Sequence, residues 1–126
     1  MAATRSNASS IEKERYALGF APNGTSVCVL CNEECNREAA ATDPNAFQLG
    51  HVESDANGGR FEWDNLAPMC RECNVWLGKR DADTSKFHFN PWERYSIPTT
   101  DDARASLKAR RIAVGEAAAR KAAARL

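Results

Sequence analysis

Short clusters of apolar residues, separated by polar turns, occupy the first hundred positions of the chain. Residues 1–8 are small and polar and predict a disordered start. Ser9 and Glu12 then form a capping box, in which each side chain satisfies a backbone N–H at the beginning of a helix. This pattern predicts a short helix that runs to about Leu18 and is closed by Gly19.

The following stretch alternates between β-forming and turn-forming residues. Residues 25–30 predict a short strand, and the polar residues 33–45 predict either a short helix or a loop. Residues 47–52 predict a second strand, and residues 60–63 predict the strand that returns beside it. The two are joined at Asn57-Gly58-Gly59, which is a strong turn signal.

A helix completes this unit and gives the order strand, turn, strand, helix. It belongs to the segment that Asp64-Asn65 opens and that carries the second cysteine pair, runs to Leu77 and stops at Gly78. Residues 84–98 are dense in aromatics and predict a segment that packs over the ββα unit, with a base-stacking surface as the alternative. These aromatic residues are Phe87, Phe89, Trp92 and Tyr95.

The last quarter of the chain is rich in alanine and arginine and predicts a helix capped by Thr100 or Asp101. It lacks a wide apolar stripe, so we expect its last turns to be solvated or bound to a partner. Together the elements predict an α+β fold with a short N-terminal helix and a C-terminal Ala/Arg-rich helix. We divide the chain into the disordered start at 1–8, a folded domain at 9–98 and a basic helix or tail at 99–126.

Composition indicates that this domain needs a cross-link, such as a bound metal ion, to stabilise its small hydrophobic core; we call this cross-link the staple. Hydrophobic residues make up 43% of the 126 positions, but many of them are alanine, which buries little area. The chain shows neither the apolar segment of a signal peptide nor a run of about 18 apolar residues. We therefore expect a cytoplasmic protein without a membrane span, in a compartment that keeps thiols reduced.

Four of the five cysteines form two C-x-x-C pairs, Cys28/Cys31 and Cys70/Cys73, separated by 38 residues. In a reducing compartment such pairs bind metal more often than they form disulfides. Two of them supply the four thiolates of a tetrahedral, structural zinc site, which is the predicted staple. The alternative is two buried pairs without metal. Cys35 is either a free thiol or a substitute for one ligand.

Charge is unevenly distributed although the net charge is zero. Residues 28–75 carry nine acids and three bases, whereas residues 76–126 carry eleven bases and six acids. Neutralising phosphates supplies most of the nonspecific affinity for DNA. Any affinity for nucleic acid should therefore come mainly from the second half of the chain. The candidate phosphate contacts are Lys79, Arg80, Arg110 and Arg111.

Several residues around the second cysteine pair form a motif in a fixed order: His51, Gly58-Gly59, Asn65-Leu66 and Cys73-Asn74. In this order and spacing the chain resembles the HNH endonuclease family over about residues 28–80, including the knuckles of its zinc-bearing members. The resemblance implies a ββα-metal fold, DNA as substrate and a catalytic divalent cation, Mg²⁺ or Mn²⁺. We further expect a bacterial protein, or a phage protein in the host cytoplasm.

Hydrolysis of a phosphodiester needs an activated water and a cation that neutralises charge on the phosphate. A ββα unit can place a strand histidine and a helix ligand on the same cleft. His51, whose ordinary pKa lies near neutrality, is the candidate general base. Asn65 is expected to orient the loop or the His51 ring, with a helix N-cap as the alternative. Asn74 is expected to offer its carbonyl oxygen to the cation.

The residue before His51 departs from the family pattern. Many members carry Asp or His there as a metal ligand, and this chain has Gly50. One ligand is therefore missing, and the metal site is weaker unless one of four residues supplies it: Glu53, Asp55, Asp81 or His88. The resemblance thus implies a metal-dependent DNA endonuclease, a hydrolase of phage or mobile-element type, whereas the residues alone predict a His-centred site on a zinc-held ββα unit. The alternatives are a non-catalytic zinc module that binds DNA or a protein, and an accessory subunit whose C-terminal helix docks on a larger enzyme complex.

Overall fold

The computed structural model describes residues 9–124, so the predicted disordered start at 1–8 lies outside the described residues. The described chain forms helices and two small antiparallel sheets, which confirms the α+β class. The longer elements are α1 (Ser10–Phe20), β1 (Thr25–Val27), β2 (Glu34–Asn36), β3 (Phe47–His51), β4 (Leu66–Cys70), α2 (Arg71–Leu77), α3 (Pro91–Arg94) and α4 (Thr100–Ala123). Short 3₁₀ helices lie in the connections: η2 (Asp55–Asn57), η3 (Trp63–Asn65) and η4 (Thr84–Lys86).

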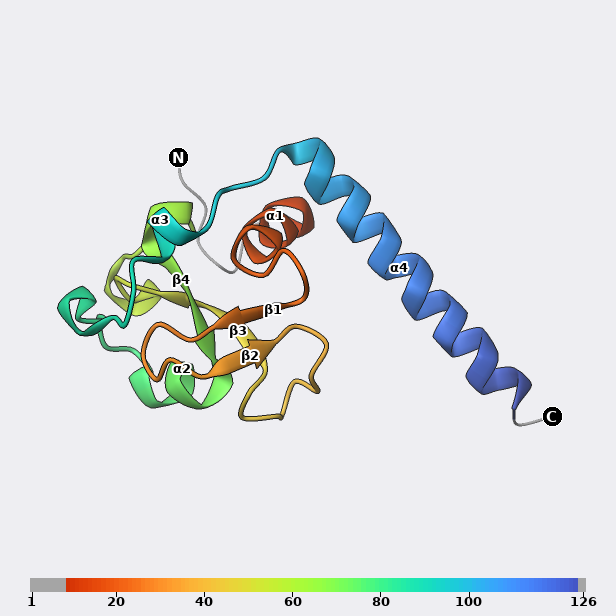
Figure 1. The fold of residues 1–126 in the computed structure, drawn as a ribbon, viewed down its shortest axis with the longest axis horizontal. Coiled ribbons are helices and arrows are strands. Elements are labelled where there is room, and N and C mark those ends of the chain that lie inside the picture. The colour runs from red at the N-terminus through yellow and green to blue at the C-terminus, as the bar shows by residue number, and fades with distance from the viewer. Residues whose placement is uncertain (1–8, 125–126) are drawn as a thin grey trace.

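The predicted ββα unit consists of β3, β4 and α2, with the two strands at the centre of the molecule (Figure 1). β3 and β4 pair antiparallel, with His51 opposite Leu66. The prediction of a return strand at residues 60–63 is wrong, because the strand begins at Leu66. Phe61 instead turns into the core and is 3% exposed. The second cysteine pair consequently lies where β4 passes into α2.

α1 begins at the predicted cap, where Ser9 Oγ accepts a hydrogen bond from the backbone N–H of Glu12 (3.2 Å). It continues past the predicted end to Phe20, so Gly19 does not close the helix. A Cβ at Gly19 would lie 2.6 Å from Cζ3 of Trp63. Glycine at this position therefore allows α1 to approach the indole closely, which is a packing role.

The first cysteine pair lies in the hairpin that joins β1 and β2. β1 ends at Val27, earlier than predicted, because the backbone N–H of Cys28 turns away to the carbonyl of Glu33 (2.9 Å). β2 lies in the polar stretch for which a helix or a loop was predicted, and its pairing with β1 supplies the bonds that the short strand needs. This hairpin brings the first knuckle against the start of α2.

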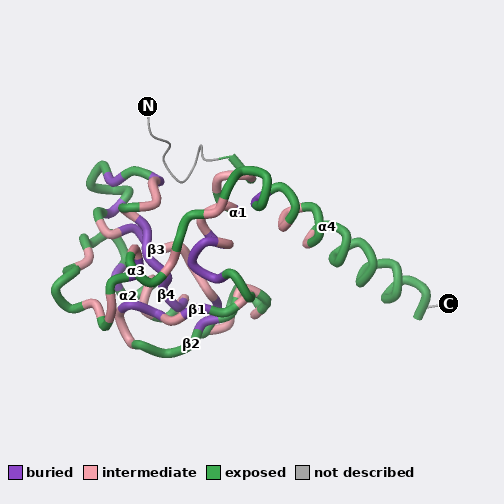
Figure 2. The backbone as a smooth tube through the Cα atoms, turned by 45° about the horizontal axis from the view of Figure 1, so that its top comes forward, coloured by how far each residue is buried: buried purple, intermediate pink, exposed green. Residues whose placement is uncertain are grey.

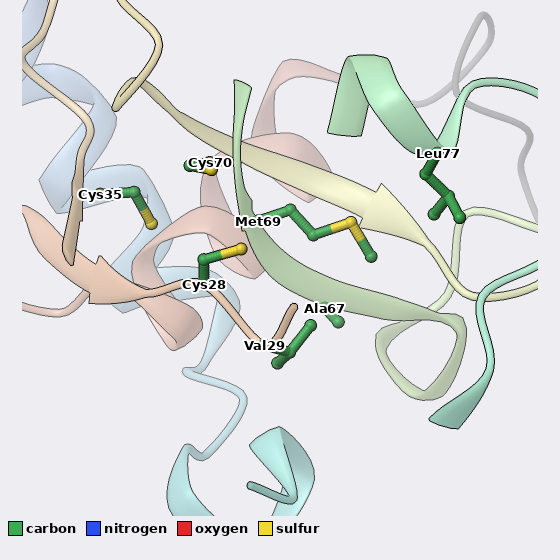
Figure 3. Packing of buried hydrophobic residues seen from close by; sticks show 7 residues of the cluster. All are labelled: Cys28, Val29, Cys35, Ala67, Met69, Cys70 and Leu77. Carbon is green, nitrogen blue, oxygen red and sulfur yellow. The ribbon is translucent and has the colours of Figure 1, made fainter. Parts of the chain in front are cut away.

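Two groups of buried side chains hold the fold together. One group surrounds the knuckles (Figure 3) and consists of Cys28, Val29, Cys35, Ala67, Met69, Cys70 and Leu77. The other consists of Phe20, Phe61 and Leu66. The aromatic segment covers both, since Phe87 and Phe89 pack on the first group and Trp92 and Tyr95 on the second. The prediction that this segment packs over the ββα unit is confirmed.

α4 is attached to the body by its first turns only. Its cap is Thr99, one residue before the predicted pair, and Thr99 Oγ1 accepts from the backbone N–H of Asp102 (3.1 Å). Ala103 is fully buried where α4 packs on α1, and Arg110 binds the carboxylate of Glu14 (2.9 Å). Residues 111–124 are exposed, and the helix projects away from the body (Figures 1 and 2).

Candidate active site

The four paired cysteines converge on one point. The sulfur atoms of Cys28, Cys31, Cys70 and Cys73 all lie within 4.8 Å of one another. Cys31 Sγ and Cys70 Sγ are 3.9 Å apart. A tetrahedral Zn²⁺ with bonds of about 2.3 Å separates its sulfur ligands by about 3.8 Å. The residues therefore fit a structural zinc ion, and we refer to these four side chains as the thiol cluster.

Local backbone geometry explains how each knuckle presents its sulfurs. Asn32 adopts φ 62°, and its N–H donates to the carbonyl of Cys28 (2.9 Å), which closes a tight turn around the first pair. Asparagine tolerates this left-handed conformation better than most residues. At the second pair, Cys70 Sγ caps α2 by accepting from the N–H of Cys73 (3.4 Å). The positive end of the helix therefore faces a sulfur, which favours the thiolate.

The thiols differ in their acidity. Burial raises the pKa of Cys28, but hydrogen bonds from the backbone of Cys70, Cys31 and Leu30 outweigh it and lower that pKa below its ordinary value. Burial and the neighbouring Cys28 raise the pKa of Cys31 to about 11. Burial and the contact with Cys70 also raise the pKa of Cys73. A dication at the centre would stabilise all four thiolates, so metal binding and proton release are linked.

Cys35 is fully buried but does not belong to the metal-binding group of the described residues. Burial, reinforced by the nearby Cys28 and Cys70, raises its pKa to about 12. A thiol with this pKa stays protonated at neutral pH and acts as a small apolar side chain. Of the two readings of Cys35, the structure favours the free thiol.

A second site lies at the other end of the ββα unit. It is a cavity of about 320 Å³ lined by His51, Ser54, Asp55, Ala56, Asn74, Leu77, Gly78 and Lys79. His51 reaches it from the end of β3 and Asn74 from the middle of α2. The antiparallel pairing of β3 and β4 thus brings together two residues that the sequence separates by more than twenty positions. We call this the His51 cavity.

Residues 28–80 match the HNH endonuclease family. The match covers the thiol cluster and the His51 cavity together, and we refer to it as the HNH segment. The fold of this family is of the ββα-metal type, and the match suggests nuclease activity. Searches of the curated proteins and of the solved structures gave no significant match. Among the described residues, no helix combines the length and the apolar character needed to cross a bilayer.

Asn65 of the HNH segment clasps the loop that follows His51. Its Oδ1 accepts from the N–H of Glu53 (2.8 Å), and its Nδ2 donates to the carbonyls of Glu53 (3.1 Å) and Arg60 (2.9 Å). Asn65 therefore caps no α-helix, and its contacts are those of a loop-orienting residue. The clasp also requires Gly59, because a Cβ there would overlap the carbonyl oxygen of Glu53.

Gln48 is a residue of the site that the sequence motif did not reveal. Its Oε1 accepts a hydrogen bond from Asn74 Nδ2 (2.8 Å), which fixes the orientation of the Asn74 amide. Gln48 lies two positions before Gly50 on β3, so both face the same side of the strand. That alternation was the available signal, but only the position of α2 shows which side chain Gln48 meets.

Met69 occupies the space beside Gly50. A Cβ at Gly50 would overlap the Sδ of Met69 and lie 2.8 Å from its Cε. Met69 is itself fully buried and lies alongside the strands, with its thioether reaching towards Leu77 (Figure 3). The position that carries a ligand in many HNH proteins is therefore filled by a core side chain here.

Of the four residues considered as replacement ligands, Asp55 alone lines the His51 cavity. Asp81 instead accepts hydrogen bonds from Asn57 Nδ2 (3.0 Å) and from the N–H of Ser54 (2.8 Å). These bonds lower the pKa of Asp81 and tie the loop after β3 to the end of α2. His88 is exposed, and its backbone N–H donates to Val29.

The basic residues of the second half are used in different ways. Lys79 lines the His51 cavity. The Arg80 guanidinium caps α2 by donating to the carbonyls of Leu77 and Trp76. Arg110 is engaged with Glu14, whereas Arg111 lies on the exposed part of α4.

Proposed function

We propose that this protein is a metal-dependent endonuclease that hydrolyses phosphodiester bonds of DNA, with His51 as the general base. One observation carries the proposal: His51 from a strand and Asn74 from a helix line a single cavity inside the HNH segment. A histidine has an ordinary pKa of about 6.5, so a substantial fraction can accept a proton at neutral pH. His51 takes that proton from the attacking water at a ring nitrogen.

Asn74 and Asp55 are the residues that would hold a Mg²⁺ or Mn²⁺ ion in this cavity. Both offer oxygen atoms, which such hard cations prefer. Gln48 binds the amide nitrogen of Asn74, so the side-chain oxygen is the atom assigned to the cation. When bound, the cation supplies charge neutralisation at the phosphate. Asn65 keeps the loop that carries Asp55 in register with β3 through the clasp on Glu53.

The thiol cluster has a separate task in this proposal. Four cysteine ligands saturate a tetrahedral Zn²⁺ and leave no position for water or substrate. The zinc therefore holds β4, α2 and the first knuckle together and takes no part in hydrolysis. Removing it should unfold residues 9–98, which we treat as one domain.

DNA affinity is assigned to the basic second half of the chain. Lys79 lies beside the reacting groups, and Arg111 lies on the exposed part of α4, where a phosphate can reach it. Arg80 and Arg110 are held by protein carbonyls and by Glu14, so they contribute positive charge at fixed places. We treat residues 99–126 as a separate basic helix that extends the DNA contact of the domain.

A second candidate function rests on the packing of Met69 against Gly50. If this packing weakens cation binding too far, the HNH segment acts as a non-catalytic zinc module that binds DNA. The exposed end of α4 would then dock the module on a larger complex, such as that of a phage or mobile element.

Cleavage of supercoiled plasmid tests the proposal. The zinc-loaded protein should nick or linearise the plasmid with Mg²⁺ or Mn²⁺ and should be inactive after brief EDTA treatment, with the zinc content measured in parallel. Asn74→Ala should lower the rate at ordinary Mg²⁺ and regain part of it at high Mn²⁺, because it weakens binding of the cation. Equal rates for wild type and Asn74→Ala at every metal concentration would contradict the role of Asn74.

The second candidate function, a non-catalytic zinc module, needs a different experiment. Gly50→Asp alone should disturb the core, since Met69 fills the space, so the added carboxylate is tested together with Met69→Ala. Met69→Ala by itself is the matched control. If wild type and the double variant both fail to cleave with any divalent ion yet bind DNA, the zinc module is the correct description.

A further inference from the structure

α2 exposes two large apolar side chains directly after Asn74. Val75 is 61% exposed and Trp76 is 67% exposed. The other two tryptophans are half-buried and pack on the core group of Phe20. An indole left in water forgoes the stabilisation that burial would provide, so an ordered, exposed tryptophan suggests a binding surface.

Arg80 holds the Trp76 ring in place. The Arg80 Cζ lies 4.2 Å from the centroid of the indole ring. The same guanidinium donates to the carbonyls at the end of α2, including that of Leu77 (3.1 Å). The indole is thus stacked under a fixed positive charge. Arginine combined with an aromatic plane is a combination that nucleic-acid-binding proteins use for stacking on bases.

The position of Trp76 links it to the His51 cavity. A smaller cavity of about 200 Å³ lies beside the indole and is lined by Leu30, Trp76, Leu77, Arg80, Asp81, Ala82, Asp83 and Lys86. Leu77 lines this cavity and the His51 cavity alike, so the two are neighbours. Asn74 and Trp76 lie two positions apart and thus on different faces of α2, so a polymer must cross the end of the helix to contact both.

The charges around this surface suit a polyanion. Lys79 and Arg80 lie on the turn that follows α2, and Lys86 lies at the end of η4. The two acids of the same stretch stay anionic while they accept hydrogen bonds, so these five side chains together carry a net charge of +1. Asp81 accepts from Ser54 and Asn57, and Asp83 accepts from the hydroxyl and the N–H of Ser85.

We infer that Trp76, with Val75 beside it, is a DNA-stacking wedge that lies against a base next to the cleaved phosphate and so positions that phosphate at His51. The inference rests on the proposed function and adds a positioning residue to it. Stacking of a base on an aromatic ring is worth a roughly 5- to 150-fold change in affinity, from about 1–3 kcal/mol per base. Apolar side chains inserted at a base step also unstack the two bases and kink the duplex.

The test uses full-length, zinc-loaded protein in the His51→Ala background, so that a duplex is bound and not cut. A duplex should gain fluorescence on binding when 2-aminopurine occupies the side of the opened base step that does not stack on Trp76, and the protein's tryptophan emission should be quenched. Adding Trp76→Ala should abolish both signals and weaken binding by roughly 5- to 150-fold. Trp76→Phe should keep most of the affinity. Ile97→Ala, at an exposed apolar residue outside α2 and α4, should change neither the signals nor the affinity.

In protein that keeps His51 and can therefore cut DNA, Trp76→Ala should also lower the rate of plasmid cleavage. Unchanged binding and cleavage in Trp76→Ala would overturn the inference and leave the proposed nuclease intact. A wild type that neither binds nor cleaves DNA would overturn both. If Trp76→Ala dissociates a dimer seen by sedimentation and leaves DNA binding unchanged, the surface joins two copies of the chain and the inference is wrong.

Discussion

The thiol cluster and the His51 cavity lie at opposite ends of the same ββα unit but differ in the kinds of side chain that form them and in the space between those side chains. The thiol cluster gathers four identical ligands within 4.8 Å and needs nothing further to close around a metal. The His51 cavity gathers a ring, an amide and a carboxylate around about 320 Å³ of space. One arrangement is suited to holding the chain, and the other leaves room for a reacting molecule.

The largest effect is expected from breaking the thiol cluster. Cys70→Ser removes a zinc ligand and also the thiolate that caps α2. Structural zinc contributes on the order of 10–16 kcal/mol in small peptides, which rivals the stability of a whole domain. The variant should therefore contain no zinc and show no cooperative thermal unfolding, as measured by elemental analysis and circular dichroism.

Cys35→Ser is the matched control for this experiment. It lies outside the metal-binding group, so zinc content should stay at one ion per chain, although burial of a hydroxyl should lower stability modestly. A wild-type protein that is fully folded and free of zinc would contradict the prediction that the cluster is a zinc site.

Next in size is the loss of the candidate base. His51→Ala should reduce plasmid cleavage by about 10²–10⁴-fold, the usual range for a general base, and keep the zinc. The side chain is 8% exposed and its ring centroid is 6.0 Å from that of Phe61, so a small loss of melting temperature is also expected. His88→Ala, at the other histidine, should leave the rate unchanged. Equal cleavage by wild type and His51→Ala would place the base elsewhere.

A mutation in a third region, around Glu14, should lower stability without affecting the thiol cluster or the His51 cavity. Glu14 is buried on α1 and binds Arg37 and Arg110. Glu14→Gln leaves the largely buried Arg37 side chain without its anion and Arg110 with only Glu38 at 4.0 Å, and it should lower the free energy of unfolding by about 3 kcal/mol. Zinc content and cleavage rate per folded molecule should not change. Glu38→Gln, whose carboxylate is exposed, should have almost no effect on stability.

The Glu14 cluster also predicts a pH dependence. Burial raises the pKa of Glu14, but hydrogen bonds from Arg37 and Arg110 outweigh it and lower that pKa below 4.5. A depressed pKa means that the folded state binds fewer protons than the unfolded state. The stabilisation is thus present above pH 4.5 and disappears as the pH falls through the folded pKa. Glu14→Gln should flatten this acid limb in denaturant unfolding measured against pH.

The smallest expected effect is on the affinity for DNA. Arg111→Ala should reduce the slope of log K against log salt by about 0.9, the amount expected for one phosphate contact. Arg110→Ala should lower stability as well, because it removes a partner of Glu14. An unchanged salt slope in Arg111→Ala would favour α4 as a protein-docking element.

The two regions also differed in how far the sequence could predict them. The thiol cluster follows from two short spacings, so its ligands were named from the sequence. The order of the ββα unit and its stop at Gly78 were predicted as well. The place of the return strand was not, because it depends on Phe61 entering the core. The same holds for Gln48, whose bond to Asn74 exists only once α2 has packed on β3.

The contact between Gly50 and Met69 has an evolutionary consequence. The two residues lie on neighbouring strands, and a side chain at position 50 would need the space that Met69 fills. A substitution at position 50 or 69 alone should therefore destabilise the core through a clash or a cavity. In an alignment of relatives, the two columns should covary: glycine at 50 should accompany a long residue at 69, and Asp or His at 50 should accompany a short one. Such paired changes would mark where lineages gained or lost the extra metal ligand.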